Sequence, residues 1–421
     1  MRVIVLGAGL LGVTTAYYLQ HLGHEVTVID RHATPAARLL GLASHRGRDD
    51  FPPFVAGSPP LSSPRTTPVG RLLRATHRRL RHAGHAFGGV LASRHPETPV
   101  EHMVRLDRYS HETLRALRED AGLSAGPNTL HGDGLMDFYT SARAFQRAVQ
   151  RAPHLQRLGS TRLLMSADEA VRLEPALAHI RPALVGATYA ARTEPSDPSP
   201  FVTELVSLCR SAGVRFVMRH TVVALHAADG RVRNVEATDA GGRTRLFDAD
   251  AYVLALGTQT MAHAATLGLD LPDTVAREDV VTIPIAAPQK AFRIALRDHE
   301  ARLRFSRVTD ADGRDCMRIT RTRLAGPGMR EAAPSRFGAM LDRAEHLFPD
   351  TLDAQQASFQ TRVRRTTPHD LPLIGRTPLR NLFLHSSRGP MQWVHACGTG
   401  KSLAWIVSGM RPQVNFAFTG R

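Results

Sequence analysis

The chain has 421 residues, of which 43% are hydrophobic, and this length favours roughly two or three domains over a single core. It contains no run of about 18 apolar residues, so no transmembrane helix is predicted. Its three cysteines lack the paired spacing of a zinc site or a disulfide framework, and no metal is predicted. The formal charge of +16 comes almost wholly from scattered arginines, since only Lys290 and Lys401 are lysines, and no specific nucleic-acid binding is predicted.

The N-terminal stretch has the pattern of a dinucleotide-binding βαβ unit. An apolar strand runs into a Gly-x-Gly-x-x-Gly turn, an apolar helix follows, and a second apolar strand ends in Asp30. Gly7 permits the tight turn, Gly9 lets the backbone approach a pyrophosphate, and Gly12 lets the helix pack close to the sheet. The unpaired N–H groups of the helix would bind the phosphates, and Asp30 would bind a ribose. The predicted cofactor contacts here are Leu6, Gly7, Ala8, Gly9, Leu10, Leu11, Gly12, Asp30 and Arg31.

Residues 31–65 are rich in glycine and proline and predict a long irregular crossing. Residues 70–87 predict a basic amphipathic helix, which either lies on an anionic bilayer or is solvated with one side on the core. Helices are predicted at 101–121, ended by Gly122, and at 141–150, with a strand at 132–140 between them. Ser166 and Glu169 have the spacing of a capping box.

The second half begins with a predicted helix at 199–212 and short strands at 214–217 and 222–225. A β-meander is predicted between Asp229 and Phe247, followed by an apolar run at 249–256 that ends in Gly257, as in a buried parallel strand. Such a return after a meander is the arrangement of two-dinucleotide-type flavoproteins. Strands within 281–305 and 316–322 predict a second sheet. The C-terminal stretch returns to the cofactor-binding unit. It contains a predicted strand at 381–385, a glycine turn at 398–400 and a helix at 401–408.

These residues resemble the D-amino-acid dehydrogenase small-subunit group of the glycine/D-amino-acid oxidase-like FAD-dependent oxidoreductases. The likeness is strongest at 1–31 and most specific at 361–412, through Arg364, Thr367-Pro368, Pro372-Leu373-Ile374-Gly375 and residues 393–400. It implies an α/β fold with a two-dinucleotide-type FAD-binding Rossmann-like domain and a second mixed-sheet substrate domain. The expected FAD-binding domain is discontinuous, at 1–65, 140–270 and 360–421, and the substrate or cap domain takes 66–139 and 271–359.

The resemblance implies FAD as the cofactor, with its ADP end on the βαβ unit and the backbone of Val222 at the adenine edge. Gly257 joins the cofactor-binding residues, and Gly398, Thr399 and Gly400 are expected at the flavin pyrimidine, where a helix N-terminus stabilises negative charge. A simple helix-entry turn is the alternative for these glycines. Arg364 is expected to hold the substrate carboxylate through its planar guanidinium; a surface ion pair is the alternative.

The implied reaction is oxidative deamination of D-amino acids to 2-oxo acids and ammonium, with hydride transfer from Cα to flavin N5 and electrons passing to a quinone or other acceptor. Three segments depart from the family pattern: 38–47, Arg277-Glu278-Asp279-Val280, and Ser387-Arg388-Gly389. Because of these departures, a glycine or sarcosine-type amine oxidase that uses oxygen and a non-catalytic flavin-binding relative remain alternatives. The expected location is cytoplasmic, with peripheral contact to the inner face of the cell membrane as a further expectation.

Overall fold

The structure is a computed structural model, and it describes residues 1–36, 98–123, 134–191, 199–272, 274–310, 313–324, 335–387 and 392–420. The basic helix expected at 70–87, most of the irregular crossing, and the divergent segments at 38–47 and 388–389 lie outside these residues. Among the helices described, none combines the length and the apolar character needed to cross a membrane.

One sheet has six strands in the order β16-β17-β10-β1-β2-β6. β17, β10, β1, β2 and β6 are parallel, and β16 is antiparallel to β17 at one edge. Their near-continuous apolar sequences suit parallel strands covered on both faces. The bounds are β1 (Arg2–Leu6), β2 (Glu25–Ile29), β6 (Arg215–Val217), β10 (Ala251–Leu254), β16 (Leu373–Arg376) and β17 (Leu382–Ser386).

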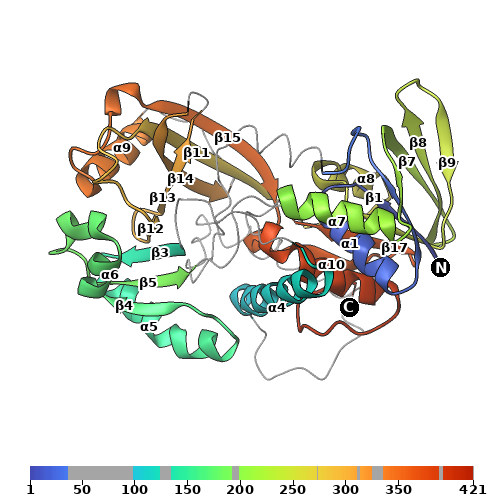
Figure 1. Ribbon diagram of the computed structural model, residues 1–421, viewed down its shortest axis with the longest axis horizontal. Helices are drawn as coiled ribbons and strands as arrows, with labels where there is room; N and C mark the ends of the chain where they lie inside the picture. The colour runs from blue at the N-terminus through green and yellow to red at the C-terminus, as the bar shows by residue number, and fades with distance from the viewer. Residues whose placement is uncertain are drawn as a thin grey trace, which may run out of the picture.

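The two faces of this sheet belong to two different cores because side chains alternate along each strand. Val3 and Val5 pack with helices α1 (Leu10–His21), α4 (Pro99–Ala121), α7 (Ser199–Ser211) and α10 (Gln392–Val407). Ile4 and Leu6 pack instead with the meander β7 (His220–Ala228), β8 (Arg231–Asp239) and β9 (Thr244–Phe247), and with α8 (Thr260–Thr266). In Figure 1 these elements lie on the right, with the meander at the rim.

The second sheet has eight strands in the order β15-β11-β14-β13-β12-β3-β5-β4 and lies on the left of Figure 1. The strands are β3 (Gly134–Tyr139), β4 (Leu163–Ser166), β5 (Gly186–Ala191), β11 (Thr274–Pro284), β12 (Ala295–Asp298), β13 (Leu303–Thr309), β14 (Asp315–Leu324) and β15 (Ser358–Thr366). Helices α6 (Ala167–Leu173) and α9 (Ser335–Leu347) close a core on one face around Met136, Phe305 and Ile319. The remaining α-helix of the described residues is α5 (Ala142–Arg157). Short 3-10 turns cover Pro175–Ile180, Gly257–Gln259, Ala354–Gln356 and Pro368–Asp370.

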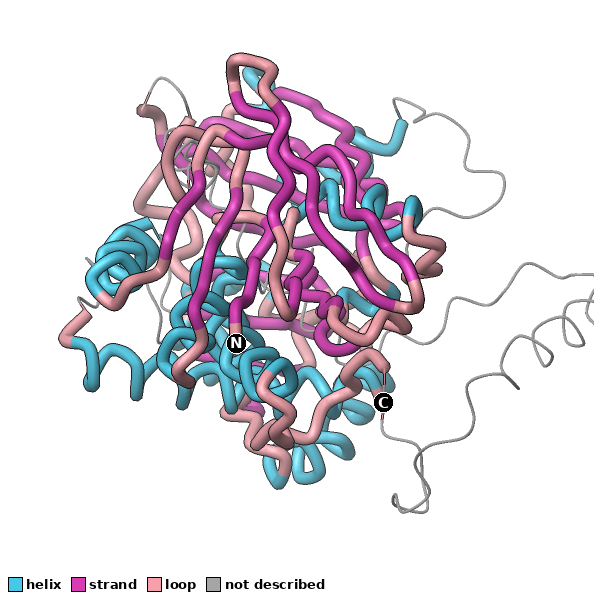
Figure 2. Tube along the Cα trace, turned by 90° about the vertical axis from the view of Figure 1, so that its right-hand side faces the viewer, coloured by secondary structure: helices cyan, strands magenta, loops and turns pink. Residues whose placement is uncertain are grey.

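The view from the meander side shows most strands gathered in the upper part of the molecule and most helices in the lower part (Figure 2). The predicted α/β class, with a Rossmann-like sheet and a second mixed sheet, is confirmed. The meander is confirmed as β7–β8–β9. Gly122 ends α4 in the left-handed conformation, with φ of 64°, and Ser166 and Glu169 form a complete capping box.

The packing of the elements departs from the expected domain limits in three places, and the limits themselves stay a prediction. β4 and β5 lie within 140–191, and β15 begins at Ser358, yet all three strands pair in the eight-stranded sheet rather than in the six-stranded one. α4 lies in a stretch assigned to the cap, but Leu106 and Leu114 are buried in the core of the six-stranded sheet. The alternation of a strand or helix shows which face is apolar, and it does not show which sheet that face meets.

Candidate cofactor and substrate site

The carboxyl ends of four neighbouring parallel strands meet at one edge of the six-stranded sheet. β1 ends just before Gly7, β2 just before Asp30, β10 shortly before Gly257, and β17 just before Ser387. The register aligns Leu6 with Ile29 on one side and with Leu254 on the other. Ligands of open α/β sheets bind outside the carboxyl ends of the strands. The tertiary structure therefore brings Gly7, Asp30 and Gly257 to the same edge.

The three glycines of the first turn differ in what surrounds them. A Cβ at Gly7, whose φ is 110°, would lie 2.4 Å from the carbonyl oxygen of Ala255, and a Cβ at Gly12 would lie 1.8 Å from that of Gly7. A Cβ at Gly9 would meet no atom of the described residues within 4 Å. The protein itself therefore needs glycine at positions 7 and 12, whereas the space beside Gly9 suits a ligand.

Helix α1 begins directly after Gly9, which is its N-cap and provides no side-chain hydrogen bond. The first N–H groups of a helix have no partner within the helix, and they bind anions together with the positive end of its dipole. Leu10 and Leu11 stand at this position, as the sequence predicts. An extended dinucleotide with its pyrophosphate beside Gly9 fits this edge.

Asp30 stabilises the glycine turn that follows β1 by accepting backbone hydrogen bonds. Its Oδ2 accepts a hydrogen bond of 2.8 Å from the backbone N–H of Ala8, and its Oδ1 accepts from the N–H of His32 at 2.8 Å and contacts His32 Nδ1 at 2.7 Å. The side chain is 14% exposed. Asp30 therefore has a structural role at the turn that sequence reasoning missed, and its contact with a ribose stays a prediction, as does that of the exposed Arg31.

Val222 and Gly257 lie on two further elements near this edge. Val222 is buried in β7, opposite Ala237 of β8, and β7 forms one edge of the meander. Gly257 has a φ of 58° and open space at its Cβ position. Only glycine adopts this conformation readily, which accounts for its place at the tip of β10. Their contacts with a cofactor stay predictions.

The prediction of a glycine turn at 398–400 is wrong, because Gly398, Thr399 and Gly400 lie inside helix α10. A Cβ at Gly398 would lie 2.3 Å from Ser110 Oγ of α4, and a Cβ at Gly400 would lie 3.0 Å from Thr14 Oγ1 of α1. These glycines let α10 pack closely against two helices. The helix begins at Gln392, so any dipole effect of α10 acts there. Flavin contacts of 398–400 stay a prediction.

His385, at the end of β17, is fully buried between α1 and α10 and was missed by sequence reasoning. Its Nδ1 lies 2.7 Å from Thr15 Oγ1, and its Nε2 lies 2.9 Å from Thr399 Oγ1. Burial lowers the pKa of His385 from 6.5 to about 3, so the ring is neutral near pH 7. The imidazole therefore links α1, which follows the turn at residues 7–9, to α10.

A second missed pair joins α10 to α4. His395 is 1% exposed, and its Nε2 lies 3.5 Å from Asp107 Oδ1. His395 stands one turn before Thr399, whose hydroxyl donates to the carbonyl oxygen of His395 at 2.8 Å. No motif in the sequence pointed to Asp107, because it lies on a separate helix and pairs with His395 only in the folded chain.

Arg364 lies in β15, where its backbone pairs with Ala276 of β11. Its side chain is outside the described part of the structure, so the carboxylate role stays a prediction. Asp279, in one of the three divergent segments, is 1% exposed and accepts hydrogen bonds from Thr361 Oγ1 at 3.0 Å and from Arg277 Nε at 3.3 Å. Both hydrogen bonds go to Oδ1, whereas the buried Oδ2 has no hydrogen-bond partner among the described residues.

Comparisons with known proteins agree with this architecture. The family described as FAD dependent oxidoreductase matches residues 2–48 and 70–406. A D-amino acid dehydrogenase of Dechloromonas aromatica (strain RCB) is 31% identical over 437 residues, which cover 99% of each protein. Among solved structures, L-proline dehydrogenase from P. horikoshii has a TM-score of 0.65 at 16% identity, over 98% of this chain and 94% of that one. Glycine oxidase from Geobacillus kaustophilus has a TM-score of 0.61 at 19% identity, over 100% and 99%.

Proposed function

The chain belongs to the family of FAD-dependent oxidoreductases, and on this premise we propose that it oxidises D-amino acids to 2-oxo acids and ammonium. The observation that carries the proposal is the likeness to the D-amino acid dehydrogenase of Dechloromonas aromatica, which extends over almost the whole of both chains. The solved structures are more distant in sequence and support the fold alone.

The residues of the sheet edge support the cofactor half of this proposal. The open space beside Gly9 and the uncapped start of α1 suit the pyrophosphate of FAD, and Asp30 keeps the turn in place. FAD, when bound, supplies the group that accepts the hydride from the substrate Cα. Ala8, Leu10 and Leu11 contribute backbone to the same turn.

The substrate half of the proposal depends on Arg364. A guanidinium binds a carboxylate through two parallel hydrogen bonds, which orients the amino acid as well as holding it. Such orientation is the main catalytic task left to the protein when the amine is already neutral and the cofactor accepts the hydride. We assign this role to Arg364, whose strand β15 forms one edge of the eight-stranded sheet.

The electrons would pass to a quinone or another acceptor. The protein would contact the cytoplasmic face of the membrane peripherally. The competing candidate is an amine oxidase that passes the electrons to oxygen. Peroxide production during aerobic turnover separates the two, since an oxidase forms it in proportion to substrate consumed and a dehydrogenase needs an added acceptor.

The test of the function is the visible spectrum of the purified protein before and after anaerobic addition of single D-amino acids. We expect flavin absorbance that bleaches with one or a few D-amino acids and does not bleach with their L-enantiomers. Bleaching by L-amino acids alone, or by glycine and sarcosine alone, would overturn the proposed substrate class. Flavin that no amine bleaches would contradict the proposed reaction.

A further inference from the structure

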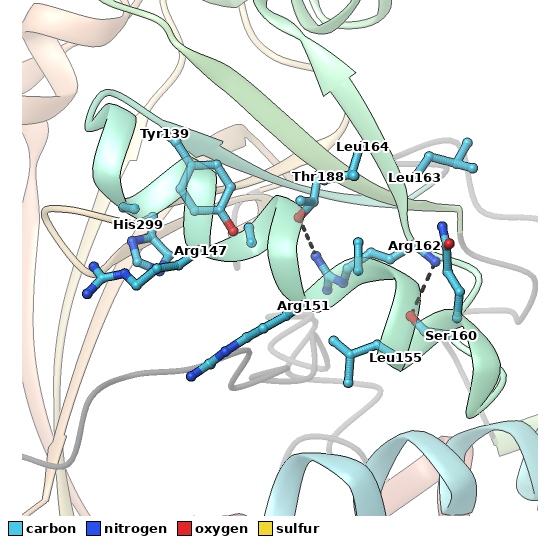
Figure 3. A pocket seen from close by; sticks show the side chains of 14 residues that line it. Tyr139, Arg147, Arg151, Leu155, Ser160, Arg162, Leu163, Leu164, Thr188 and His299 are labelled. Atoms are coloured by element: carbon cyan, nitrogen blue, oxygen red, sulfur yellow. Dashed lines mark hydrogen bonds between the residues drawn. The ribbon is translucent and has the colours of Figure 1, made fainter.

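A pocket lies between helix α5 and the end of the eight-stranded sheet formed by β3, β5 and β4 (Figure 3). Helix α5 has 16 residues, of which only Ala144 is buried, so it covers the sheet loosely. The proposed function leaves this pocket unused. The lining residues that matter here are Arg147, Arg151, Arg162, Leu155, Leu163 and Leu164.

The floor of the pocket carries a buried ionic cluster. Asp137 of β3 is fully buried, and its Oδ2 accepts hydrogen bonds from Arg162 Nη1 at 2.8 Å and from Arg297 Nη2. Arg162 Nη1 also donates to Thr188 Oγ1 at 3.1 Å, as the dashed line in Figure 3 marks. Two guanidinium groups share this carboxylate, and Arg162 also interacts electrostatically with Asp107 of α4. Arg162 itself lines the pocket.

The opening of the pocket is positive. Arg147 and Arg151 lie one turn apart on α5, are exposed, and form no ion pair within the described part of the chain. Helix α5 carries Arg143, Arg147, Arg151 and Arg157 and no acidic residue. None of the described residues that line the pocket is acidic. An anion is therefore the ligand that the charges of this pocket favour.

The walls of the pocket are apolar. Ala148, Ala152 and Leu155 line it from α5, and Leu163 and Leu164 line it from β4. Leu163 is 56% exposed and Leu164 is 38% exposed, although both belong to a strand of the sheet. Covering apolar area of this kind contributes about 25 cal/mol per Å². A ligand with an apolar chain would gain this contribution, whereas a small inorganic anion would not.

We propose that this pocket is a second binding site, which takes an organic carboxylate with an apolar chain. The carboxylate group lies beside Arg147 and Arg151 at the opening, and the chain lies along Leu155, Leu163 and Leu164. In the order of the eight-stranded sheet, Arg364 lies on the edge strand β15, and the pocket lies against β3, β5 and β4 at the other end. This inference stands independently of the proposed function.

The test measures binding of decanoate, below its micelle concentration, to the flavin-loaded protein by isothermal titration calorimetry. We expect one saturable site whose affinity falls as salt is added, because the charges at the opening are exposed. Decyltrimethylammonium, which has the same chain and the opposite charge, should not bind there. Inorganic phosphate should compete only weakly. Equal binding of the cationic amphiphile, or phosphate as tight as decanoate, would overturn the proposed ligand class.

Two double variants locate the site. Arg147→Gln with Arg151→Gln removes the charges at the opening and should weaken decanoate binding about tenfold, since exposed charges each contribute modestly. Arg143→Gln with Arg157→Gln changes net charge equally on the same helix, outside the pocket lining, and should leave the affinity within about twofold. Equal losses in the two double variants, or no loss in the first, would place decanoate elsewhere. Arg162 is left intact because its removal would leave Asp137 short of a partner.

Discussion

The carboxylate of Asp30 accepts a hydrogen bond of 2.8 Å from the backbone N–H of Ala8, and this contact ties the end of β2 to the glycine turn after β1. The same carboxylate accepts the N–H of His32 through its other oxygen. The acid at the tip of the second strand thus shapes the turn beside which the cofactor pyrophosphate is proposed to bind.

Replacing Asp30 by Ala should weaken both the fold and flavin retention. Removal leaves the N–H of Ala8 without its acceptor, at a cost of about 1–3 kcal/mol of unfolding free energy. Flavin content per protein and thermal unfolding measure the two effects. Asp239→Ala is the control, because Asp239 accepts from the backbone of Gly241 and Arg243 in the meander. It should destabilise the protein without loss of flavin, and a similar flavin loss in both variants would contradict the role given to Asp30.

The glycines at positions 9 and 12 should fail in different ways. Gly9→Val should fold and lose flavin, because within the described part of the chain the new Cβ meets no atom within 4 Å and projects where the pyrophosphate is proposed. Gly12→Ala should lose folded protein itself, because its Cβ would lie 1.8 Å from a backbone oxygen. Circular dichroism reports the fold, and visible absorbance reports the flavin. Retention of flavin by folded Gly9→Val would refute the placement of the pyrophosphate.

Stability should fall in acid through His385. Burial lowers its pKa to about 3, so the unfolded chain binds a proton below about pH 6.5 that the folded chain does not bind until near pH 3. The contribution of His385 is fully present above pH 6.5 and decreases as the pH falls toward 3, by up to about 1.4 kcal/mol per pH unit.

Urea unfolding of flavin-loaded protein at several values between pH 7 and 5 tests this. His385→Asn should be less stable at pH 7, because it disturbs the link between Thr15 and Thr399, and its stability should change less with pH than that of the parent protein. An unchanged slope in His385→Asn would refute the assignment.

Arg364→Ala should retain flavin and lose affinity for the amino acid. A charge-assisted bidentate contact contributes about 1.5–3 kcal/mol, so KM for the D-amino acid that bleaches the flavin should rise about ten- to a hundredfold. Steady-state kinetics with an artificial acceptor measure this rise. Arg362→Ala is the matched control, since Arg362 lies on the same strand, is exposed and should leave KM near the parent value. An unchanged KM in Arg364→Ala would place the carboxylate site elsewhere.

The sequence by itself determined the local elements and the cofactor unit. The βαβ pattern, the αL stop at Gly122, the capping box at Ser166 and the meander all depend on contacts between residues close in the chain, so a linear pattern contains them. The family resemblance added FAD and the oxidoreductase class, which the comparison with the whole chain confirms.

Only the tertiary structure decided which surfaces meet. The glycine pair at 398 and 400 has the appearance of a turn in the sequence, yet it serves helix packing against Ser110 and Thr14, which are remote in the chain. The same holds for His385 between two helices, for Asp107 opposite His395, and for Arg162 and Arg297 on Asp137. Buried polar groups and close helix contacts are satisfied by partners from distant segments, and no local pattern specifies those partners.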